Sequence, residues 1–190
     1  MSQEEKGQAM AKPSITNHHL PESFCGSMKI SKDVPSQSVI AIKDMFGDVE
    51  ISGPVPENCN TKEFYSDLIR GHLKPQRVVR GRVTCLLTVT PAITNVYRTV
   101  HGGAIAAIAE MMSIASARTV VAEDKELFLG ELSMSYLSGA RNNEEVIVDG
   151  SVVRSGRNLS VVAVEFKLEK TGQLIYTARA TFYHMPVAKL

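Results

Sequence analysis

The sequence has no dominant sign of charge. Its 190 residues include 21 Lys and Arg side chains against 20 Asp and Glu, which leaves a formal net charge of +1. A general attraction to nucleic acid or to an anionic membrane surface needs a clear basic excess. We therefore expect no nucleic-acid partner, and any bound anion must be held locally. Long uncharged apolar runs are also lacking, so we expect no membrane span.

Cysteine is scarce and shows no paired spacing. Cys25, Cys59 and Cys85 are odd in number and form no Cys-X-X-Cys pair. Disulfide frameworks and zinc sites both need paired spacings, so this pattern favours a reducing compartment. Histidine does not supply a metal site either, because His18 and His19 lie in a polar stretch and the other three are isolated from one another. We expect no metal and no cofactor.

The N-terminal stretch lacks the features of a targeting leader. It carries Glu4 and Glu5, and its first arginine is Arg70, which argues against a secretory signal and a mitochondrial presequence. By contrast, Ala188-Lys189-Leu190 is a small-basic-Leu tripeptide of the type read by the peroxisomal import receptor. We expect a peroxisomal protein that this receptor binds. Because three residues match easily by chance, cytoplasmic residence is the alternative.

The N-terminal third reads as an added segment before one folded domain. The hydrophobic fraction of 44% and the charged fraction of 22% are ordinary for a globular chain of this length. We expect an N-terminal extension over residues 1–60, flexible at first and then with a short helix over Ser36–Phe46. The domain then spans residues 61–186 and begins with a helix capped by Asn60 or Thr61, and residues 187–190 form a tail.

After this helix the hydrophobic period changes to two, which is typical of strands. Gln76–Thr90 is predicted as one long strand interrupted by a bulge at Gly81. Four more predicted strands form hairpins at Ser155-Gly156 and Thr171-Gly172, and they span Leu127–Leu137, Glu145–Arg154, Asn158–Glu169 and Gln173–His184. Together with one long apolar helix, this order predicts an α+β fold in which an antiparallel sheet curls around the helix.

That helix, predicted over residues 102–121, contains the most informative side chain. Between Gly102 and Ala117, Glu110 is the one residue that carries a charge at neutral pH. A helix that is apolar on every side is a buried helix, and burial without a partner strongly disfavours a charged carboxylate. The pattern therefore indicates a chemical site. A carboxylate hydrogen-bonded to a neighbouring loop is the structural alternative. We expect Met111 and Met112 to be core residues.

Several motifs at consistent spacing resemble the hotdog-fold acyl-CoA thioesterases, in particular the PaaI-like group that includes the small mammalian and plant enzymes. The resemblance covers roughly residues 61–184. Its matching positions are Asn95 six residues before His101, the His101-Gly102 pair that opens the helix, Glu110 nine residues after the histidine, Ser135-Tyr136-Leu137-Ser138-Gly139-Ala140, and the hairpin Arg154-Ser155-Gly156-Arg157-Asn158-Leu159.

The resemblance implies hydrolysis of an acyl-CoA to a free acid and coenzyme A, with Glu110, Gly102, His101 and Asn95 as the catalytic set. It also implies that the 154–159 hairpin binds coenzyme A, together with Tyr136 and Tyr183. One position departs, because Leu129 stands where the animal branch carries a catalytic serine. Because of this difference, the sequence resembles more closely the branch of the family that uses a glutamate without that serine. Two alternatives share the fold: a 3-hydroxyacyl-CoA dehydratase, which lacks the Gly-Gly opening, and a non-catalytic acyl-CoA-binding protein.

The residue types suit thioester hydrolysis. Gly102 at a helix N-terminus offers unpaired backbone N–H groups and close approach to a developing oxyanion, and Glu110 in apolar surroundings suits a general base. Direct attack by Glu110, giving an anhydride, is the alternative. His101 and Glu110 are nine positions apart, which at about 1.5 Å and 100° per residue means opposite faces and roughly 13 Å of axial separation. We therefore expect a shared site in a homodimer at least. A homotetramer is a further expectation, which this spacing does not decide.

Each motif also has a simpler interpretation. His101 can serve only to cap the helix, Asn95 can be an ordinary turn residue, and Arg154 and Arg157 can be solvated charges beside a glycine turn. The acyl group is not specified by the sequence, because chain length depends on the shape of a tunnel. Both aliphatic and aromatic acyl-CoAs are therefore candidate substrates.

Overall fold

The computed structural model describes residues 34–40 and 57–186, and the chain divides into two compact units at Glu57/Asn58. In the first unit residues 36–40 are helical. They are the start of the predicted Ser36–Phe46 helix, and the remainder of that prediction lies outside the described residues. The same holds for residues 1–33 and for the tripeptide at 188–190. The second unit holds the sheet and the long helix.

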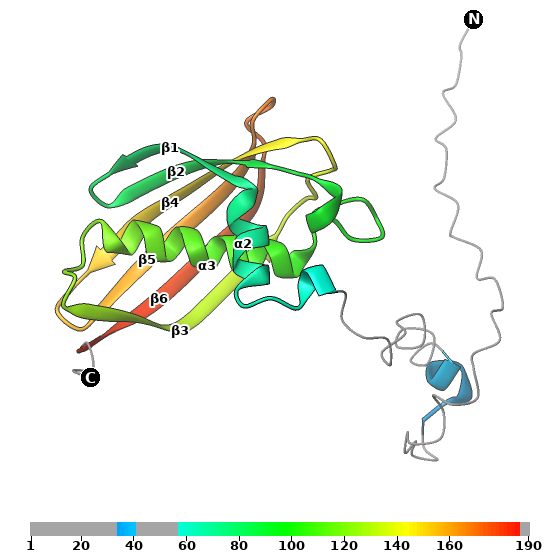
Figure 1. Cartoon of the computed structure of the whole chain (residues 1–190), viewed down its shortest axis with the longest axis horizontal. Coiled ribbons are helices and arrows are strands. Elements are labelled where there is room, and N and C mark those ends of the chain that lie inside the picture. The colour runs from blue at the N-terminus through cyan, green and yellow to red at the C-terminus, as the bar shows by residue number, and fades with distance from the viewer. Residues whose placement is uncertain (1–33, 41–56, 187–190) are drawn as a thin grey trace, which may run out of the picture. The chain divides into compact units, whose positions relative to one another are not determined.

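Six antiparallel strands and one long helix build the second unit (Figure 1). The strands follow the order β1-β2-β4-β5-β6-β3 across the sheet, and the helix α3 lies along its concave face. This is the predicted architecture of a sheet curled around a helix. In chain order the elements are η2 (Glu57–Cys59), α2 (Phe64–Gly71), β1 (Leu73–Val79), β2 (Arg82–Thr88), η3 (Pro91–Ile93), α3 (Gly102–Arg118), β3 (Lys125–Tyr136), β4 (Glu145–Ser155), β5 (Leu159–Leu168) and β6 (Leu174–Pro186).

The prediction of one long strand over Gln76–Thr90 is wrong, because the chain reverses in its middle. β1 and β2 pair with each other as a hairpin, with Val79 opposite Arg82. Gly81 adopts a φ of +79°, a left-handed conformation that glycine accepts without a Cβ clash. The glycine therefore marks a tight turn rather than a bulge. β1 becomes the edge strand of the sheet.

The start of α2 also differs from the prediction. Neither Asn60 nor Thr61 caps the helix. Instead, Glu63 precedes it in a left-handed conformation (φ 65°) and makes no side-chain capping hydrogen bond. The C-terminal end is better held, because the Nδ1 of His72 donates to the carbonyl of Leu68 at 2.6 Å and its Nε2 lies 2.6 Å from Thr90 Oγ1. α2 is therefore fixed mainly at its last turn.

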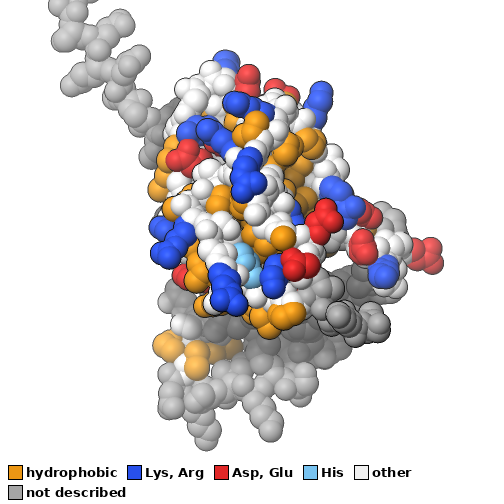
Figure 2. Space-filling model, turned by 90° about the vertical axis from the view of Figure 1, so that its left-hand side faces the viewer, with side chains coloured by type: hydrophobic (Ala, Val, Ile, Leu, Met, Phe, Trp, Pro, Cys, Tyr) orange, Lys and Arg blue, Asp and Glu red, His pale blue; other side chains and the backbone are white. Residues whose placement is uncertain are grey.

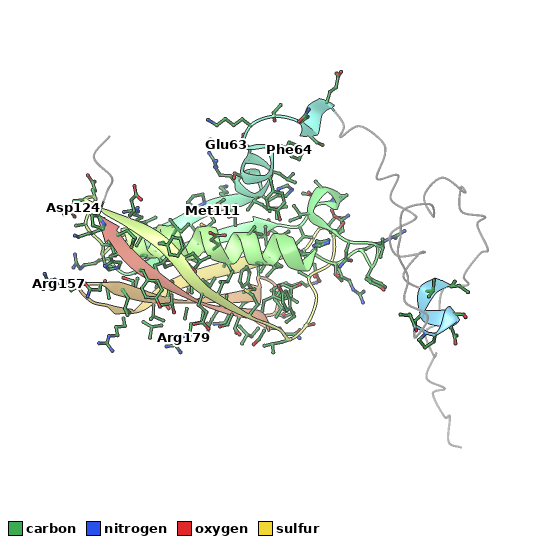
Figure 3. All side chains as sticks on the ribbon, turned by 90° about the horizontal axis from the view of Figure 1, so that it is seen from below. Glu63, Phe64, Met111, Asp124, Arg157 and Arg179 are labelled. Carbon is green, nitrogen blue, oxygen red and sulfur yellow. The ribbon has the colours of Figure 1, made fainter. Side chains whose placement is uncertain are left out.

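α3 packs one face on the sheet, and the other face is only partly covered. The sheet-facing side chains are buried: Ala104, Ile105, Ile108, Ala109, Met112, Ser113, Ser116 and Ala117. The expectation of a helix buried on every side is therefore wrong for the described chain. Glu110 and Met111 are half-buried, because the sheet covers one side of α3 and the short α2 crosses the other (Figure 3). In the part of the chain that the structure describes, no helix is long and apolar enough to span a membrane.

The outer face of the sheet carries charged and aromatic side chains away from α3. Arg82 binds Asp149 through two hydrogen bonds, one of them of 2.8 Å, and Thr84 donates to the same carboxylate at 2.9 Å. Partial burial alone raises the pKa of the Asp149 carboxyl, but the Arg82 and Thr84 hydrogen bonds and the nearby cations outweigh it and hold that pKa below its usual range. Phe128 on the same face is 61% exposed.

α3 approaches the sheet closely at Gly150 on β4. A Cβ at this position would lie 2.4 Å from Ser116 Oγ and 3.1 Å from the Met112 carbonyl oxygen. The Ser116 hydroxyl is fully buried and donates to that same carbonyl at 2.8 Å, so it has no free direction in which to move. We therefore expect Gly150→Ala to push α3 off the sheet and to lower the free energy of unfolding by about 2–4 kcal/mol.

Chemical denaturation measures this cost, and Gly130→Ala is the matched control. A Cβ at Gly130 would also meet a close neighbour, but that neighbour is the ring of Tyr183, which is half-exposed and can swing away. The control should lose clearly less stability than Gly150→Ala. Equal losses would show that the contact between β4 and α3 is not the tight point of the fold.

Candidate functional site

His101 caps the N-terminus of α3. Its Nδ1 accepts a hydrogen bond from the Gly103 N–H at 3.0 Å, and its carbonyl accepts from the Ile105 N–H at 3.1 Å. Among the described residues, no acceptor contacts the Gly102 N–H. The first turn of a helix carries unpaired donors and the positive end of the helix dipole. The Gly102 N–H is therefore available for an oxyanion, and the observed role of His101 is that of a cap.

Asn95 shapes the loop that leads into α3. Its Oδ1 accepts hydrogen bonds from the Tyr97 N–H at 2.9 Å, from the Thr99 N–H at 3.3 Å and from the Thr99 hydroxyl at 3.2 Å. The His101 N–H then donates to the Ile93 carbonyl at 2.8 Å. Through these bonds the loop side chain fixes where the helix begins. The structure thus shows a positioning contact for Asn95, in line with the simpler interpretation.

Two tyrosines hold the same end of α3 against the sheet. The Tyr136 hydroxyl donates to the Gly102 carbonyl at 3.1 Å, and its ring packs edge-on against Tyr176 with 5.8 Å between centroids. The Tyr176 oxygen accepts from the Ala140 N–H at 3.0 Å, and burial raises the pKa of this phenol. A Cβ on Gly102 would stay 3.6 Å from the Tyr136 ring, an ordinary contact. The chain itself therefore tolerates a side chain at Gly102.

Glu110 lines a cleft of about 310 Å³ between α3 and α2. The other lining residues are Tyr65, Ser66, Ile69, Ala107, Met111 and Ile114, so the carboxylate faces a wall that is mainly apolar. No hydrogen bond or ion pair within the described residues uses this carboxylate, so this part of the chain offers no support for the structural alternative of a carboxylate tied to a neighbouring loop. An unpaired carboxylate in an apolar cleft is a candidate general base.

A second cleft, of about 270 Å³, lies at the N-terminal end of the same helix and is lined by His101, Gly103 and Ala104. The expectation that His101 and Glu110 occupy opposite faces is therefore wrong. His101 precedes the helix in an extended conformation, so its direction does not follow the period of about 100° per residue that holds within α3. The axial distance remains, because eight residues of helix separate Gly102 from Glu110 by about 12 Å.

The hairpin between β4 and β5 lies at the opposite end of the sheet from Gly102. Tyr136 pairs with Tyr176 on β6, whereas Leu159 pairs with Tyr183, seven positions further along the same strand. At about 3.3 Å per residue, this separation is about 23 Å. Within one chain, the structure therefore places the 154–159 hairpin far from the helix N-terminus. Tyr183 accompanies the hairpin and lies over Gly130 on the outer face.

His184 organises this hairpin, a role that the sequence did not reveal. Its Nδ1 donates to the Arg157 carbonyl at 3.2 Å, its backbone N–H donates to the Asn158 carbonyl at 2.9 Å, and its Nε2 lies 2.8 Å from the buried Ser160 hydroxyl. The Ser160 hydroxyl in turn contacts the Ser155 hydroxyl at 3.0 Å. His184 has no histidine or acidic neighbour in sequence, so its contact with the hairpin could be found only from the strand register.

Basic side chains gather at this hairpin end. Figure 3 shows Arg157 at the tip, and Figure 2 looks onto the same end and shows Lys and Arg side chains spread over it, with Asp and Glu side chains among them. Arg154 and Arg157 are exposed, and within the described residues neither forms a salt bridge. Unpaired cations at an exposed hairpin suit an anionic group such as a phosphate.

Sequence reasoning missed the residues of α2 that shape both clefts. Tyr65 and Ile69 line the two of them, and Ser66 lines the cleft that contains Glu110. The apolar period of this helix pointed to the face with Phe64 and Leu68, and nothing local indicated that Tyr65 lines the clefts beside α3. Met111, expected in the core, also lines the Glu110 cleft, whereas Met112 is buried as predicted. Leu129, at the position where the animal branch carries a serine, is not among the residues that line either cleft.

Comparison with known proteins shows what this arrangement is similar to. Residues 97–175 match the family described as Thioesterase superfamily. The chain is 24% identical over 121 residues to human acyl-coenzyme A thioesterase 13, a match that covers 64% of this chain and 86% of that protein. Among solved structures, thioesterase superfamily member 2 of zebra fish superposes with a TM-score of 0.60 at 22% identity, covering 66% of this chain and 88% of that one. A Streptococcus mutans protein solved with bound acetyl-CoA gives 0.56 at 21% identity, covering 62% and 91%.

Proposed function

We propose that this chain, which carries a thioesterase superfamily domain, hydrolyses an acyl-CoA thioester to a free carboxylic acid and coenzyme A. The observation that carries the proposal is the unpaired Glu110 carboxylate in an apolar cleft of the domain's central helix. The human relative named as an acyl-coenzyme A thioesterase supports the substrate class. So does the streptococcal structure with acetyl-CoA, whose fold this chain shares.

In the proposed reaction, Glu110 takes a proton from a water molecule that attacks the thioester carbonyl. The tetrahedral oxyanion is stabilised by the unpaired Gly102 N–H and by the positive end of the α3 dipole. Collapse of the intermediate breaks the carbon–sulfur bond and releases coenzyme A and the acid. Direct attack of Glu110 on the carbonyl, followed by hydrolysis of the anhydride, uses the same groups and remains the alternative.

A complete site needs two subunits under this proposal. About 12 Å of helix separates the Gly102 N–H from Glu110, so one carbonyl cannot meet both within one chain. A two-fold axis that brings the half-buried faces of two α3 helices together pairs Glu110 of one protomer with Gly102 of the partner subunit. The half-exposed apolar side chains around Glu110 support such a contact. The homodimer belongs to the proposal, and a homotetramer stays a prediction.

Release of free thiol tests the activity directly. The full chain is incubated with acyl-CoA substrates from short to long and with aromatic acyl-CoAs, and the thiol is measured against time. Turnover of at least one substrate supports the proposal. Thiol release from none, or hydration of an enoyl-CoA measured as loss of enoyl absorbance, would contradict it, and the latter result would indicate a dehydratase.

We also propose that the hairpin arginines hold the phosphates of coenzyme A. Such contacts are equal in the ground state and in the transition state, so replacing both Arg154 and Arg157 with Ala should raise KM for acyl-CoA about tenfold or more and change kcat little. A pantetheine thioester, which lacks the nucleotide, is the control substrate, and its KM should change clearly less. An equal rise for both substrates would show that these arginines do not contact the nucleotide.

Peroxisomal import is proposed from the sequence alone, because Ala188-Lys189-Leu190 lies outside the described residues. At a free C-terminus this tripeptide is of the type that the import receptor reads. A chain tagged at its N-terminus should give a punctate distribution that coincides with a peroxisomal marker, and deleting the tripeptide should make it diffuse without changing activity in vitro. A diffuse distribution of the tagged full chain would favour the cytoplasm.

A further inference from the structure

α2 divides the groove along the sheet-distal side of α3 into two clefts. One contains Glu110 and the other adjoins His101 and Gly103, and both are lined by Tyr65 and Ile69. Figure 3 shows α2 standing on this side of α3, with the strands on the other. The side chains of Tyr65 and Ile69 therefore form the partition between the carboxylate and the helix N-terminus.

The two partition residues differ in how firmly they are held. Ile69 is 1% exposed and belongs to the core, and the next turn is fixed by the contact of His72 with Thr90. Tyr65 lies in the first turn, is 52% exposed, and its hydroxyl makes no hydrogen bond with any described residue. The helix begins after the left-handed Glu63 without a side-chain cap. Only packing therefore fixes the Tyr65 ring, and its size sets the space beside Glu110.

We propose that Tyr65 is the residue that limits the size of the acyl group accepted beside Glu110. This inference rests on the proposed thioesterase function. Apart from Glu110 and Ser66, the cleft is lined by apolar or aromatic side chains, which suits an acyl group and not the charged nucleotide. The basic hairpin that suits the nucleotide lies at the other end of the sheet. The acyl group therefore lies against the α2 wall, and the Tyr65 ring stands where a longer chain would pass toward the second cleft.

Changing the ring should move the acyl preference in both directions. Tyr65→Ala removes the partition above Ile69 and joins the two clefts, so longer chains bury more methylenes. Each buried methylene contributes about 0.8 kcal/mol, or roughly a fourfold gain in kcat/KM. We expect Tyr65→Ala to raise the ratio of kcat/KM for the longest against the shortest substrate by about tenfold or more. Tyr65→Trp should lower that ratio.

The experiment measures kcat/KM of the full chain on a series of saturated acyl-CoAs, by thiol release, for the wild type and both variants. Tyr65→Phe keeps the ring and removes only the hydroxyl, so its profile should match that of the wild type. Phe128→Ala is the matched aromatic control, because it removes an exposed ring from the outer face of the sheet, away from both clefts. Thermal unfolding of each variant checks that α2 remains folded.

Shifted profiles in opposite directions for the Ala and Trp variants would support the inference. A uniform loss across all chain lengths would show a structural role for Tyr65 and overturn it, as would an unchanged profile in both variants. These results differ from a failure of the proposed function, in which the wild type itself releases no thiol from any substrate. If Tyr65→Ala does not fold, the Trp variant alone decides, since an unchanged preference there also overturns the inference.

Discussion

Glu110→Gln should abolish most thioester hydrolysis while leaving the fold intact, with kcat reduced by at least about a hundredfold. Glutamine keeps the shape of the side chain but cannot accept a proton from water at neutral pH, nor can it attack a carbonyl. The fold should survive because no described residue depends on this carboxylate for a hydrogen bond or an ion pair, and because the side chain is only half-buried.

Steady-state thiol release and thermal unfolding, measured on the same preparation, check this expectation. Glu126→Gln is a suitable control, because it makes the same substitution on an exposed residue of β3 that lines neither cleft. The control should keep the activity of the wild type. A folded Glu110→Gln protein with most of its turnover would remove Glu110 from the chemistry and leave the unpaired Gly102 N–H as the remaining support for a catalytic site.

Mixing two inactive variants should restore activity if each site takes Glu110 from one subunit and Gly102 from the other. Glu110→Gln lacks the base, and Gly102→Val blocks the approach of a thioester to the helix N-terminus. The valine is expected to fold, since a Cβ at Gly102 makes only an ordinary contact with Tyr136. A hybrid dimer then has one intact site and one doubly damaged site. An equal mixture, half of it hybrids, should recover about a quarter of the activity of the wild type.

The decisive control shows that subunits exchange. The two variants carry different affinity tags, and capture of both tags on one species demonstrates the hybrid. A mixture of Glu110→Gln with the double variant Glu110→Gln/Gly102→Val cannot form an intact site and should stay inactive. Hybrids that form but remain inactive would place Glu110 and Gly102 of the same chain in one site. Because about 12 Å of straight helix separates the two residues, such a result would require α3 to bend or rearrange.

The local sequence pattern was enough to predict most of the helices and strands. Strands β3, β4, β5 and β6 and the helix α3 lie within a few residues of their predicted bounds, because their alternation and periodicity match a sheet face and a helix that pack on each other. The prediction of one strand over the β1–β2 region was wrong because a glycine in a strand-like run is compatible with either a bulge or a turn. Only the pairing of Val79 with Arg82 decides between them. The predicted cap of α2 was wrong because the helix begins after Glu63, whose left-handed backbone no local pattern indicated.

The sequence by itself pointed to the residues that we propose carry the chemistry: a single carboxylate in an apolar helix, a glycine pair at that helix's start, and a basic hairpin. These follow from residue type and spacing. The tertiary structure alone decided where they lie. It separated the hairpin from the Gly102 end of the sheet by about 23 Å along β6, left the Glu110 face of α3 half-buried, and placed Tyr65 in the lining of both clefts. The physical reason is that such distances depend on strand register and helix docking, which many weak contacts far apart in the sequence fix together.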